Sequence, residues 1–329
     1  MMTFENRIVQ EDLKGIISAS YLNLEKLRGK TVLITGVSGM LATYLAYTIY
    51  YLNIHENFQT KIIGTARNME KATAKFQNLS KEYFELIQHD VTEPLEYEGA
   101  IDYIIHAASN ASPKFISTDP VGIIKANTLG TMNLLELSRK KTIQNFLFLS
   151  TREIYGKSIK NSLTEQDYGG FDILSPRACY PESKRMAETL LESYAVQYKI
   201  PYTVARIAHS YGPGMEVNND GRIMSDLISN VVNSEDIILK SEGTAERAFC
   251  YLSDATTALL TIWLNGDSGQ AYNVANEDEP IQIRELAQKL VTLLPEKKLK
   301  VKFDIPSSQS TAYSTDGRTV MDMSKIEKL

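Results

Sequence analysis

Two side chains that could carry a proton stand four residues apart in PRACYPESKRMAETL (176–190). Tyr180 and Lys184 share one face of a predicted helix, because residues at i and i+4 are neighbours on a helix. A tyrosine with an ordinary pKa near ~10 is a poor base at neutral pH, but a lysine ammonium one turn away favours the phenolate. The spacing therefore predicts that Tyr180 takes a proton from a substrate alcohol. An exposed helix pair without a catalytic role is the alternative.

A second polar group follows an apolar strand in FLFLSTREIYG (146–156). The strand ends in a serine and then releases the hydroxyl of Thr151, the guanidinium of Arg152 and the carboxylate of Glu153. Such an end either enters a solvated loop or forms one wall of an active site. Strand alternation predicts that Thr151 and Glu153 share a face, and that Arg152 points away toward the rim. On that face the Thr151 hydroxyl could share the proton of Tyr180.

A glycine turn follows the first predicted strand in TGVSGMLATYLA (35–46). It has Gly36 and Gly39, with Ala42 where a third glycine is usual. A strand, a glycine turn and a helix in this order point the helix N-terminus at a dinucleotide pyrophosphate. The position of Ala42 needs only a small side chain. A plain tight turn is the alternative, but its place at the first strand of an alternating series favours a cofactor.

The residues after the second predicted strand distinguish between the two nicotinamide cofactors. An acidic side chain there binds the ribose 2′-hydroxyl of NAD, whereas an arginine accommodates the 2′-phosphate of NADP. The sequence has Ala66 and then Arg67, which favours NADP unless Arg67 stacks on the adenine or lies in solvent. Asp90, which closes the third strand, either meets the adenine amino group or is an ordinary turn aspartate.

Strands and helices alternate through the first two thirds of the chain. Fully apolar strands between helices indicate a parallel sheet covered on both faces. We therefore expect an α/β fold, a doubly wound parallel sheet of the Rossmann type with a smaller C-terminal substrate lobe. The expected divisions are a helical prefix (1–29), a dinucleotide-binding domain (30–208) and the lobe (209–329), from which about 245–275 returns to the first domain. The predicted strands are 31–36, 61–66, 84–90, 101–108, 146–151 and 202–208, and the predicted helices are 40–53, 68–78, 119–140 and 180–199.

Composition narrows the classes of partner. The chain has 329 residues, is 43% hydrophobic and 23% charged, and carries a formal net charge of −5. Without a Lys/Arg block we expect no nucleic-acid partner, so an anionic substrate needs locally placed arginines. No apolar run reaches the roughly 18 residues of a membrane span, and the polar N-terminus is not typical of a signal peptide. Cys179 and Cys250 are expected to be buried thiols of a reducing compartment, which favours a cytoplasmic location. Because the two cysteines and the four histidines are scattered, we expect no metal site.

These motifs resemble the extended short-chain dehydrogenase/reductase family, in its NAD-dependent nucleotide-sugar epimerase/dehydratase group. The resemblance covers nearly all of residues 30–325. Within the group, the closest likeness is to the UDP-glucuronate decarboxylases, or UDP-xylose synthases. The stretches that carry it are HAASNASP (106–113), ANTLGTMNLLEL (126–137), STREIYG (150–156), PRACYPESKRMAET (176–189), DGRIMSDLI (220–228) and GTAERAFCYLSDA (243–255).

The resemblance implies bound NAD, a UDP-sugar substrate, transient oxidation at C4 of the sugar, and a homodimer formed by the helices from 119 and 180. It implies that Glu153 moves a proton at C5, or orients a water there, once C4 is a ketone. The catalytic residues are then Thr151, Glu153, Tyr180 and Lys184. Motifs and resemblance together assign the cofactor to Gly36, Ser38, Gly39, Met40, Leu41, Arg67, Asp90, Val91, Ala107, Ala108, Ser109, Asn127, Tyr180 and Lys184, and the substrate to Ser112, Arg152, His209, Arg222 and Arg247.

Two residues depart from the family's pattern. Arg152 stands where the decarboxylases have serine and the 4,6-dehydratases have an acidic aspartate, and a guanidinium cannot be that acid because it stays protonated. It could instead bind a sugar carboxylate or neutralise Glu153. His209 stands where the family has an asparagine near the nucleotide phosphates. Arg206, inside a predicted strand, is expected to be a buried structural partner.

Several functions remain open at this point. A UDP-glucuronate decarboxylase-like enzyme comes first, followed by a nucleotide-sugar 4,6-dehydratase or 4-epimerase, although a simple 4-epimerase has no need of Glu153. An NADP-dependent 4-keto-sugar reductase is favoured by Arg67. A non-catalytic dinucleotide sensor is opposed by Tyr180 and Lys184. NAD is preferred narrowly over NADP, because a cofactor recycled in place gains nothing from the 2′-phosphate.

Overall fold

A parallel sheet of seven strands forms the centre of the computed structural model, which describes residues 2–157, 160–217, 220–305 and 320–329. Its strand order is β12-β7-β5-β4-β1-β2-β3, which confirms the predicted doubly wound α/β fold. The order reverses at β1, which pairs with β2 on one side and β4 on the other, and ligands bind at the carboxyl ends beside such a switch point. The strands of the sheet are β1 (Thr31–Thr35), β2 (Lys61–Ala66), β3 (Phe84–Gln88), β4 (Tyr103–His106), β5 (Asn145–Thr151), β7 (Tyr202–Ile207) and β12 (Gln270–Val274).

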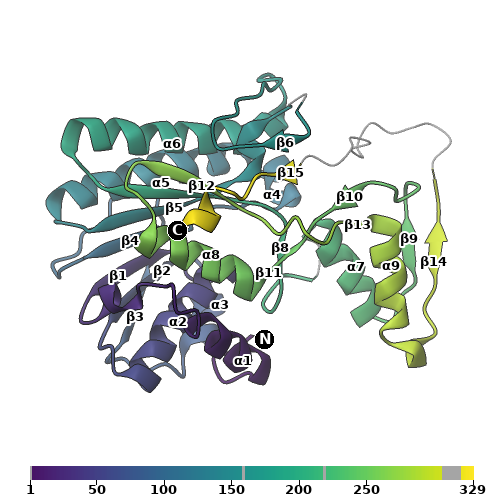
Figure 1. The fold of residues 1–329 in the computed structure, drawn as a ribbon, viewed down its shortest axis with the longest axis horizontal. Coiled ribbons are helices and arrows are strands. Elements are labelled where there is room, and N and C mark those ends of the chain that lie inside the picture. The colour runs from purple at the N-terminus through teal and green to yellow at the C-terminus, as the bar shows by residue number, and fades with distance from the viewer. Residues whose placement is uncertain (1, 158–159, 218–219, 306–319) are drawn as a thin grey trace.

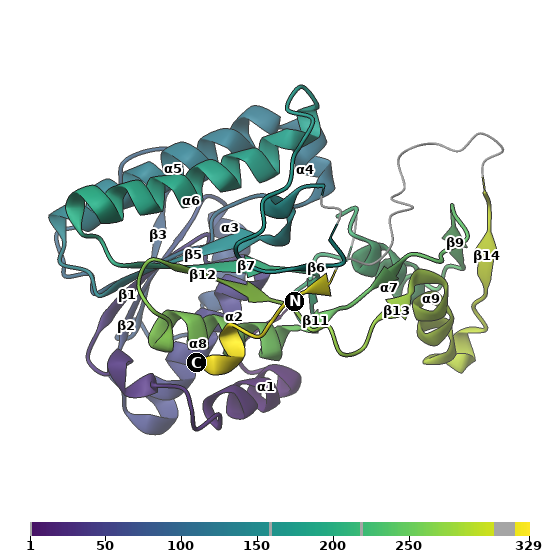
Figure 2. The ribbon, with the colours of Figure 1, turned by 45° about the horizontal axis from the view of Figure 1, so that its top comes forward.

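Helices cover both faces of this sheet (Figures 1 and 2). Helices α1, α2 and α8 lie on one face, and α5 and α6 lie side by side on the other. Alternate residues of one strand enter different layers: Val32 and Ile34 pack with α2, whereas Leu33 packs with α5. The helices of the two layers and of the connections are α1 (Arg7–Ile17), η1 (Leu24–Leu27), α2 (Met40–Glu56), α3 (Met69–Phe76), α4 (Pro113–Thr118), α5 (Pro120–Lys140), η2 (Arg152–Tyr155), η3 (Pro176–Ala178), α6 (Cys179–Tyr198) and α8 (Leu252–Asn265).

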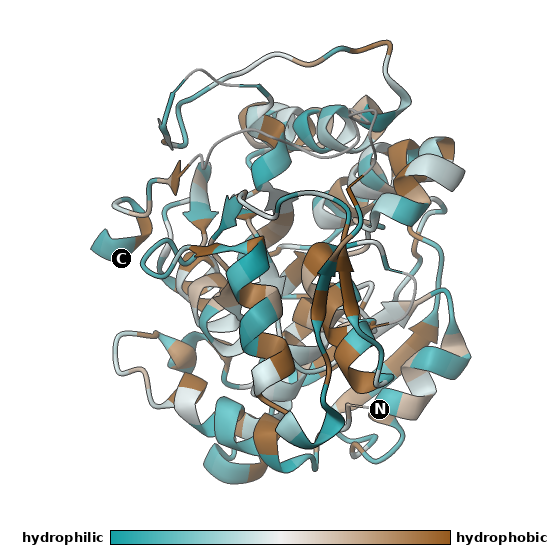
Figure 3. Ribbon diagram, turned by 90° about the vertical axis from the view of Figure 1, so that its right-hand side faces the viewer, coloured by the Kyte–Doolittle hydropathy of each residue, from teal (hydrophilic) through white to brown (hydrophobic). Residues whose placement is uncertain are grey.

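The C-terminal lobe has a core of its own, in which Met224, Leu227, Ile237 and Leu286 are buried. Figure 3 views the molecule from the side of this lobe and shows hydrophobic and hydrophilic residues mixed along its helices, as expected where only one helix face is covered. The remaining elements are β6 (Ser162–Leu163), β8 (Ser210–Tyr211), α7 (Ile223–Val232), β9 (Ile237–Leu239), β10 (Glu246–Arg247), β11 (Cys250–Tyr251), β13 (Ile281–Gln282), α9 (Ile283–Thr292), η4 (Pro295–Lys297), β14 (Val301–Phe303), β15 (Val320–Met321) and η5 (Ile326–Lys328).

The chain crosses between the lobe and the sheet more than once. After α7, the helix α8 packs under the sheet, and β12 then adds to its edge by pairing with β7. The lobe resumes with β13 and α9, and β15 finally pairs with β6 near the sheet. The chain therefore connects the lobe to the sheet at several points rather than through one linker.

The strand ends are where structure and sequence differ. The predicted strand 101–108 is shortened to Tyr103–His106, because Ala107 and Ala108 leave the sheet and Ala108 lies against Gly36. Both cysteines are buried, as predicted. In the ranges that the structure describes, no helix is long and apolar enough to cross a membrane.

Candidate active site

A cavity of about 570 Å³ lies at the carboxyl ends of the central strands. Its walls come from the β1–α2 turn, the ends of β4 and β5, helix α6 and the lobe. Of the residues predicted to act on ligands, those in its lining are Ser38, Gly39, Met40, Leu41, Ala107, Ser109, Ser112, Thr151, Arg152, Glu153, Tyr180, Lys184, His209 and Arg222.

The glycine turn is built by close approach of backbone. Gly36 has a φ of 62°, in the left-handed region that side chains rarely adopt, and a Cβ there would lie 2.7 Å from the Cα atom of Ala108. Gly39 is the N-cap of α2 and supplies no side-chain cap, so the first N–H groups of the helix remain available to an anion.

A buried lysine supports this turn from behind. Lys75 of α3 donates a hydrogen bond of 2.8 Å from Nζ to the carbonyl oxygen of Ser38. Burial lowers its pKa to about 8, with a further contribution from Lys71. Lys71 itself lines the cavity and pairs at 2.8 Å with Glu216 of the lobe. No sequence motif pointed to either lysine.

The structure brings Tyr180, Thr151 and Lys184 to one wall. The Tyr180 side chain is buried, and its pKa is raised by burial and then by the Glu153 carboxylate, while a hydrogen bond with Thr151 lowers it. Lys184 donates from Nζ to the Leu149 carbonyl at 2.7 Å. Burial lowers the pKa of Lys184 to about 7, against the opposing effect of Glu188.

A neutral histidine lies near this lysine. The Nδ1 atom of His106 lies 2.8 Å from the Thr35 hydroxyl, and burial followed by the charge of Lys184 lowers the pKa of His106 to about 3. Its Nε2 atom has no hydrogen-bond partner among the described residues. The sequence places His106 at the head of HAASNASP, which is the signal that could have identified it.

The predicted alternation of residues 151–153 is wrong. The strand β5 ends at Thr151, and residues 152–155 form the 3₁₀ turn η2, whose N-cap is Thr151. Because the backbone turns there, Arg152 does not point away: both Arg152 and Glu153 line the cavity. Residues in a 3₁₀ turn are spaced by about 120° around the axis rather than 180°, so strand alternation no longer applies.

The partner of Glu153 is an arginine from the short 3₁₀ helix η3, just before α6. Both carboxylate oxygens accept hydrogen bonds of 3.0 Å from Nη2 of Arg177, so the suggested local pairing of Glu153 with Arg152 is not formed. Sequence reasoning did not select Arg177, although it lies three residues before Tyr180. Arg152 instead contacts His209, with 3.2 Å between Nη1 and Nε2.

Arg206 is a buried structural residue, as predicted. Its guanidinium pairs at 2.7 Å with Glu188, and the same glutamate accepts a hydrogen bond from Ser150 at the end of β5. The Arg206 guanidinium also donates to Tyr155 and to the Glu165 carbonyl. This network lies behind β5 and holds its end in place.

The remaining predicted residues lie around the cavity rather than in its lining. Arg67 lies 3.6 Å from the carboxylate of Asp90, which also accepts from Thr92. Asn127 of α5 donates to Ser183 of α6. The predicted residues outside the lining are Gly36, Arg67, Asp90, Val91, Ala108, Asn127 and Arg247.

Two predicted substrate residues meet at one aspartate of the lobe. Ser112 donates to the Asp220 carbonyl at 2.7 Å, and Arg222 pairs with the Asp220 carboxylate. This contact joins the segment after β4 to the start of α7. In the part of the chain that the structure describes, no group of three or more His, Cys, Asp or Glu residues is arranged to hold a metal ion.

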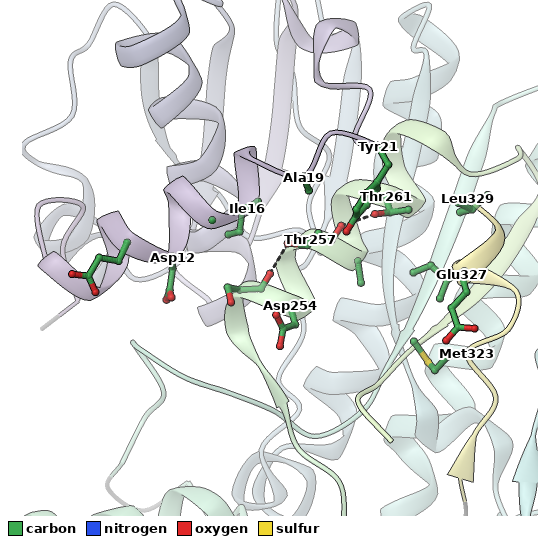
Figure 4. A pocket seen from close by; sticks show the side chains of 15 residues that line it. Asp12, Ile16, Ala19, Tyr21, Asp254, Thr257, Thr261, Met323, Glu327 and Leu329 are labelled. Atoms are coloured by element: carbon green, nitrogen blue, oxygen red, sulfur yellow. Dashed lines mark hydrogen bonds between the residues drawn. The ribbon is translucent and has the colours of Figure 1, made fainter. Parts of the chain in front are cut away.

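A second cavity, of about 800 Å³, lies away from these residues, between α1, α8 and the C-terminal turn (Figure 4). Its wall includes Asp12, Asp254 and Glu327. The Asp12 carboxylate is already occupied, because it accepts hydrogen bonds from Tyr44 at 2.8 Å and from Tyr251 at 3.0 Å. This carboxylate therefore has a structural role in joining α1, α2 and β11.

The switch-point cavity, glycine turn and buried Tyr–Lys pair define a Rossmann-type protein of the short-chain dehydrogenase/reductase kind. Residues 32–275 match the NAD dependent epimerase/dehydratase family. The chain belongs to that family.

Curated relatives and solved structures agree with this assignment. The chain is 36% identical to UDP-glucuronic acid decarboxylase 6 of Arabidopsis thaliana over 84% of this chain and 78% of the relative. It is 35% identical to UDP-glucuronic acid decarboxylase 1 of Xenopus tropicalis over 80% of this chain and 60% of that protein. The fold is shared with a UDP-glucuronic acid 4-epimerase from Bacillus cereus in complex with NAD, with a TM-score of 0.71, 20% identity and coverage of 91% and 92%.

Proposed function

We propose that the chain uses NAD to oxidise C4 of a UDP-hexuronate transiently and then releases its carboxylate as carbon dioxide. The main support is that Thr151, Tyr180 and Lys184 share one cavity wall with Glu153. The chain is also 36% identical to a UDP-glucuronic acid decarboxylase. We assign nucleotide binding to residues 30–208 and sugar binding mainly to the C-terminal lobe.

The residues at the glycine turn fit a nicotinamide dinucleotide. A side chain at Gly36 would fill the space against Ala108, and the buried Ser109 hydroxyl, in the cavity lining, has no partner among the described residues. Bound NAD supplies the acceptor for the hydride of C4. The residues proposed to hold it are Gly36, Ser38, Gly39, Met40, Leu41, Arg67, Asp90, Val91, Ala107, Ala108, Ser109 and Asn127.

The choice of NAD over NADP is supported by the environment of Arg67. Its guanidinium lies 3.6 Å from the Asp90 carboxylate, so a 2′-phosphate placed against Arg67 would also meet that negative charge. Asp90 stays ionised, because hydrogen bonds from Thr92 and the charge of Arg67 lower its pKa despite burial. Direct binding titrations test this choice: an affinity at least tenfold better for NADP, about 1.4 kcal/mol, would reverse it.

The wall residues can carry each proton of the reaction. Tyr180 takes the proton of the C4 hydroxyl, with the Thr151 hydroxyl sharing it. The charges of Arg222 and Arg177 favour the phenolate, and Lys184 in its charged form, on the same wall, adds to them. Once C4 is a ketone, the electrons of the bond from C5 to the carboxylate flow into an enolate, and carbon dioxide leaves. Glu153 then delivers a proton to C5 or orients a water that does so. Tyr180 finally returns its proton to the C4 oxygen, as the hydride that the bound cofactor would hold returns to C4.

Incubation of the purified protein with NAD and UDP-glucuronate tests the proposal. Release of carbon dioxide together with a UDP-pentose is the expected result. A UDP-hexuronate epimerised at C4 without gas release would identify a 4-epimerase, and loss of water from UDP-glucose would identify a dehydratase. Net oxidation of NADPH by a 4-keto sugar would identify a reductase, and dinucleotide binding with no turnover would identify a sensor.

We also propose that the protein is a homodimer formed through α5 and α6. These helices pack side by side on the outer face, and they expose Val121, Ile124 and Met132 on α5 and Met186 and Val196 on α6. A shared apolar surface on two neighbouring helices suits an isologous four-helix contact. Light scattering should give twice the chain mass, and Ile124→Glu with Met186→Glu should yield the monomer.

A further inference from the structure

The two residues that depart from the family's pattern touch each other. Arg152 is the first residue of η2, and His209 lies 57 positions further along, between β7 and β8. The Arg152 Nη1 atom lies 3.2 Å from the His209 Nε2 atom, and both residues line the cavity. Two unusual residues in direct contact indicate one shared role rather than two independent changes.

The chemistry of the pair fixes its charge. A guanidinium can only donate, so Nε2 of His209 must accept and the imidazole is neutral. Burial, followed by the charges of Arg152 and Arg247, lowers the pKa of His209 to about 3. The pair therefore carries the single positive charge of Arg152 throughout the physiological range of pH.

Arg152 differs from the other arginines near the site. Arg177 pairs with Glu153, Arg206 with Glu188, and Arg222 with Asp220. Within the described ranges, no carboxylate lies at ion-pair distance from Arg152. A guanidinium has five N–H donors, so the contact with His209 leaves most of them for an anion in the cavity.

The backbone around His209 holds the imidazole in place. Its φ is 43°, an uncommon conformation for a residue other than glycine. The His209 carbonyl accepts a hydrogen bond of 3.2 Å from the Cys250 N–H, and the ring lies 6.0 Å from that of Phe249. The imidazole is thus a fixed acceptor that orients the guanidinium from behind.

We propose that Arg152, oriented by His209, binds the carboxylate at C5 of the sugar and makes the site selective for uronic acids over neutral sugars. This inference rests on the proposed action on a nucleotide sugar. Arg152 follows Thr151, the partner of Tyr180, and all three line the same cavity, so the guanidinium faces the end of the sugar on which Tyr180 acts. The anion expected there is the substituent at C5. A diphosphate bound by the same guanidinium is the outcome that would contradict the proposal.

Calorimetric titration in a Tyr180→Phe background measures binding without turnover. With NAD present, UDP-glucuronate should bind roughly tenfold more tightly than UDP-glucose, because a charge-assisted hydrogen bond is gained. Adding Arg152→Ser should remove that preference by weakening UDP-glucuronate about tenfold while leaving UDP-glucose and UDP within about twofold. Adding His209→Asn should act in the same direction but less strongly, since the guanidinium is kept and only its orientation is lost.

Lys114→Ser is the matched control, because it removes one positive charge from α4 outside the cavity lining. It should leave all three affinities unchanged. Equal losses for UDP-glucuronate, UDP-glucose and UDP in Arg152→Ser would show that the guanidinium holds the diphosphate, and would overturn the proposal. A parent protein that binds both sugars equally well would do the same.

These outcomes separate this inference from the proposed function. Selective uronate binding that depends on Arg152, without carbon dioxide release by the protein with Tyr180 intact, would sustain the inference and refute decarboxylation. Decarboxylation without any preference in binding would refute only the inference. If no UDP compound binds, both fail.

Discussion

The two ends of the cavity are built in different ways. At the nucleotide end, the turn of Gly36 closes against the backbone of Ala108, and Gly39 starts α2 without a side-chain cap. At the sugar end, pairs of long side chains form the wall, such as Arg152 with His209. The nucleotide end is thus shaped mainly by backbone, whereas the sugar end is shaped by contacts between residues from different loops.

Each end contains one buried lysine, and the two lysines differ in what they support. Lys75 donates to the Ser38 carbonyl at 2.8 Å, and Lys184 donates to the Leu149 carbonyl at 2.7 Å. Burial lowers both pKa values, to about 8 and about 7. Only Lys184 lines the cavity. The first lysine supports a backbone turn, and the second lies in the cavity wall with Tyr180.

The largest expected effect comes from the sugar end. Tyr180→Phe removes the proton carrier and should lower the rate of C4 oxidation by about 10³-fold, within the usual range for a general acid–base group. Dinucleotide affinity should not change, because the nucleotide end is untouched. Absorbance of the reduced cofactor and a binding titration measure the two quantities.

Tyr198→Phe provides the matched control on the same helix. Tyr198 stacks on Arg139 far from the cavity lining, so its loss should leave the rate unchanged. Normal turnover of nucleotide sugars by Tyr180→Phe would show that the proton is carried by another group.

The next effect concerns the step after C4 oxidation. Glu153→Gln should lower final product formation by about 10²-fold, since a positioned proton-transfer group is lost. Cofactor reduction by the substrate should persist, and a 4-keto intermediate should accumulate in the mass spectrum. Glu182→Gln, which breaks an ion pair with Arg185 outside the lining, is the control. Product at the wild-type rate would reduce Glu153 to a structural role.

Gly36→Ala tests the nucleotide end. A side chain at φ 62° costs about 1–2 kcal/mol, and its Cβ would also lie 2.7 Å from the Ala108 Cα atom. Dinucleotide affinity should fall about tenfold, and Tm should fall with it. Gly15→Ala is the matched control, because nothing lies within 4 Å of its Cβ and it sits within helix α1. Unchanged affinity in Gly36→Ala would refute the assignment of the turn to the cofactor.

Lys75→Met should give the smallest change. It removes a positive charge behind the turn and should weaken dinucleotide binding only a few-fold, because the charge lies behind backbone rather than against the ligand. The parent protein should lose a similar amount of affinity as pH rises through about 8, where Lys75 deprotonates. The methionine variant should show no such loss. A parallel pH dependence in both proteins would assign it to another group.

The same lysine makes a prediction about stability with a definite sign. The pKa of Lys75 is lowered from 10.5 to about 8 on folding, so between these values the unfolded chain binds more protons than the folded one. Its contribution to the free energy of unfolding therefore rises with pH across that window. Denaturant titrations at pH 8 and 10 should show this rise reduced in Lys75→Met.

Local patterns explain what the sequence could predict. The runs of apolar residues predicted the strands of the sheet. The glycine turn was recognisable because its residues are neighbours in sequence, and the Tyr180–Lys184 pair because its residues are one helical turn apart. Arg206 was predictable because a charge inside an apolar strand needs a buried partner.

The contacts between distant residues were not predictable in this way. Arg152 meets His209 across 57 positions, and Glu153 meets Arg177 across 24. The failure of strand alternation after Thr151 had a local cause. The Thr151 side chain caps the 3₁₀ turn η2, and the apolar pattern of the sequence does not predict that turn. Lys75 resembles a surface lysine in sequence and is buried only because α3 packs under the turn.

The ion pair of Lys71 with Glu216 has a consequence for the timing of ligand exchange. It joins α3 to the lobe, and both residues line the cavity, so separating these two walls breaks the 2.8 Å contact. Both side chains are about half exposed, and such pairs contribute about 0.2–1 kcal/mol and weaken with salt. We expect the residence time of a bound ligand to shorten by up to about fivefold at high ionic strength, because salt weakens the ion pair that joins the two walls.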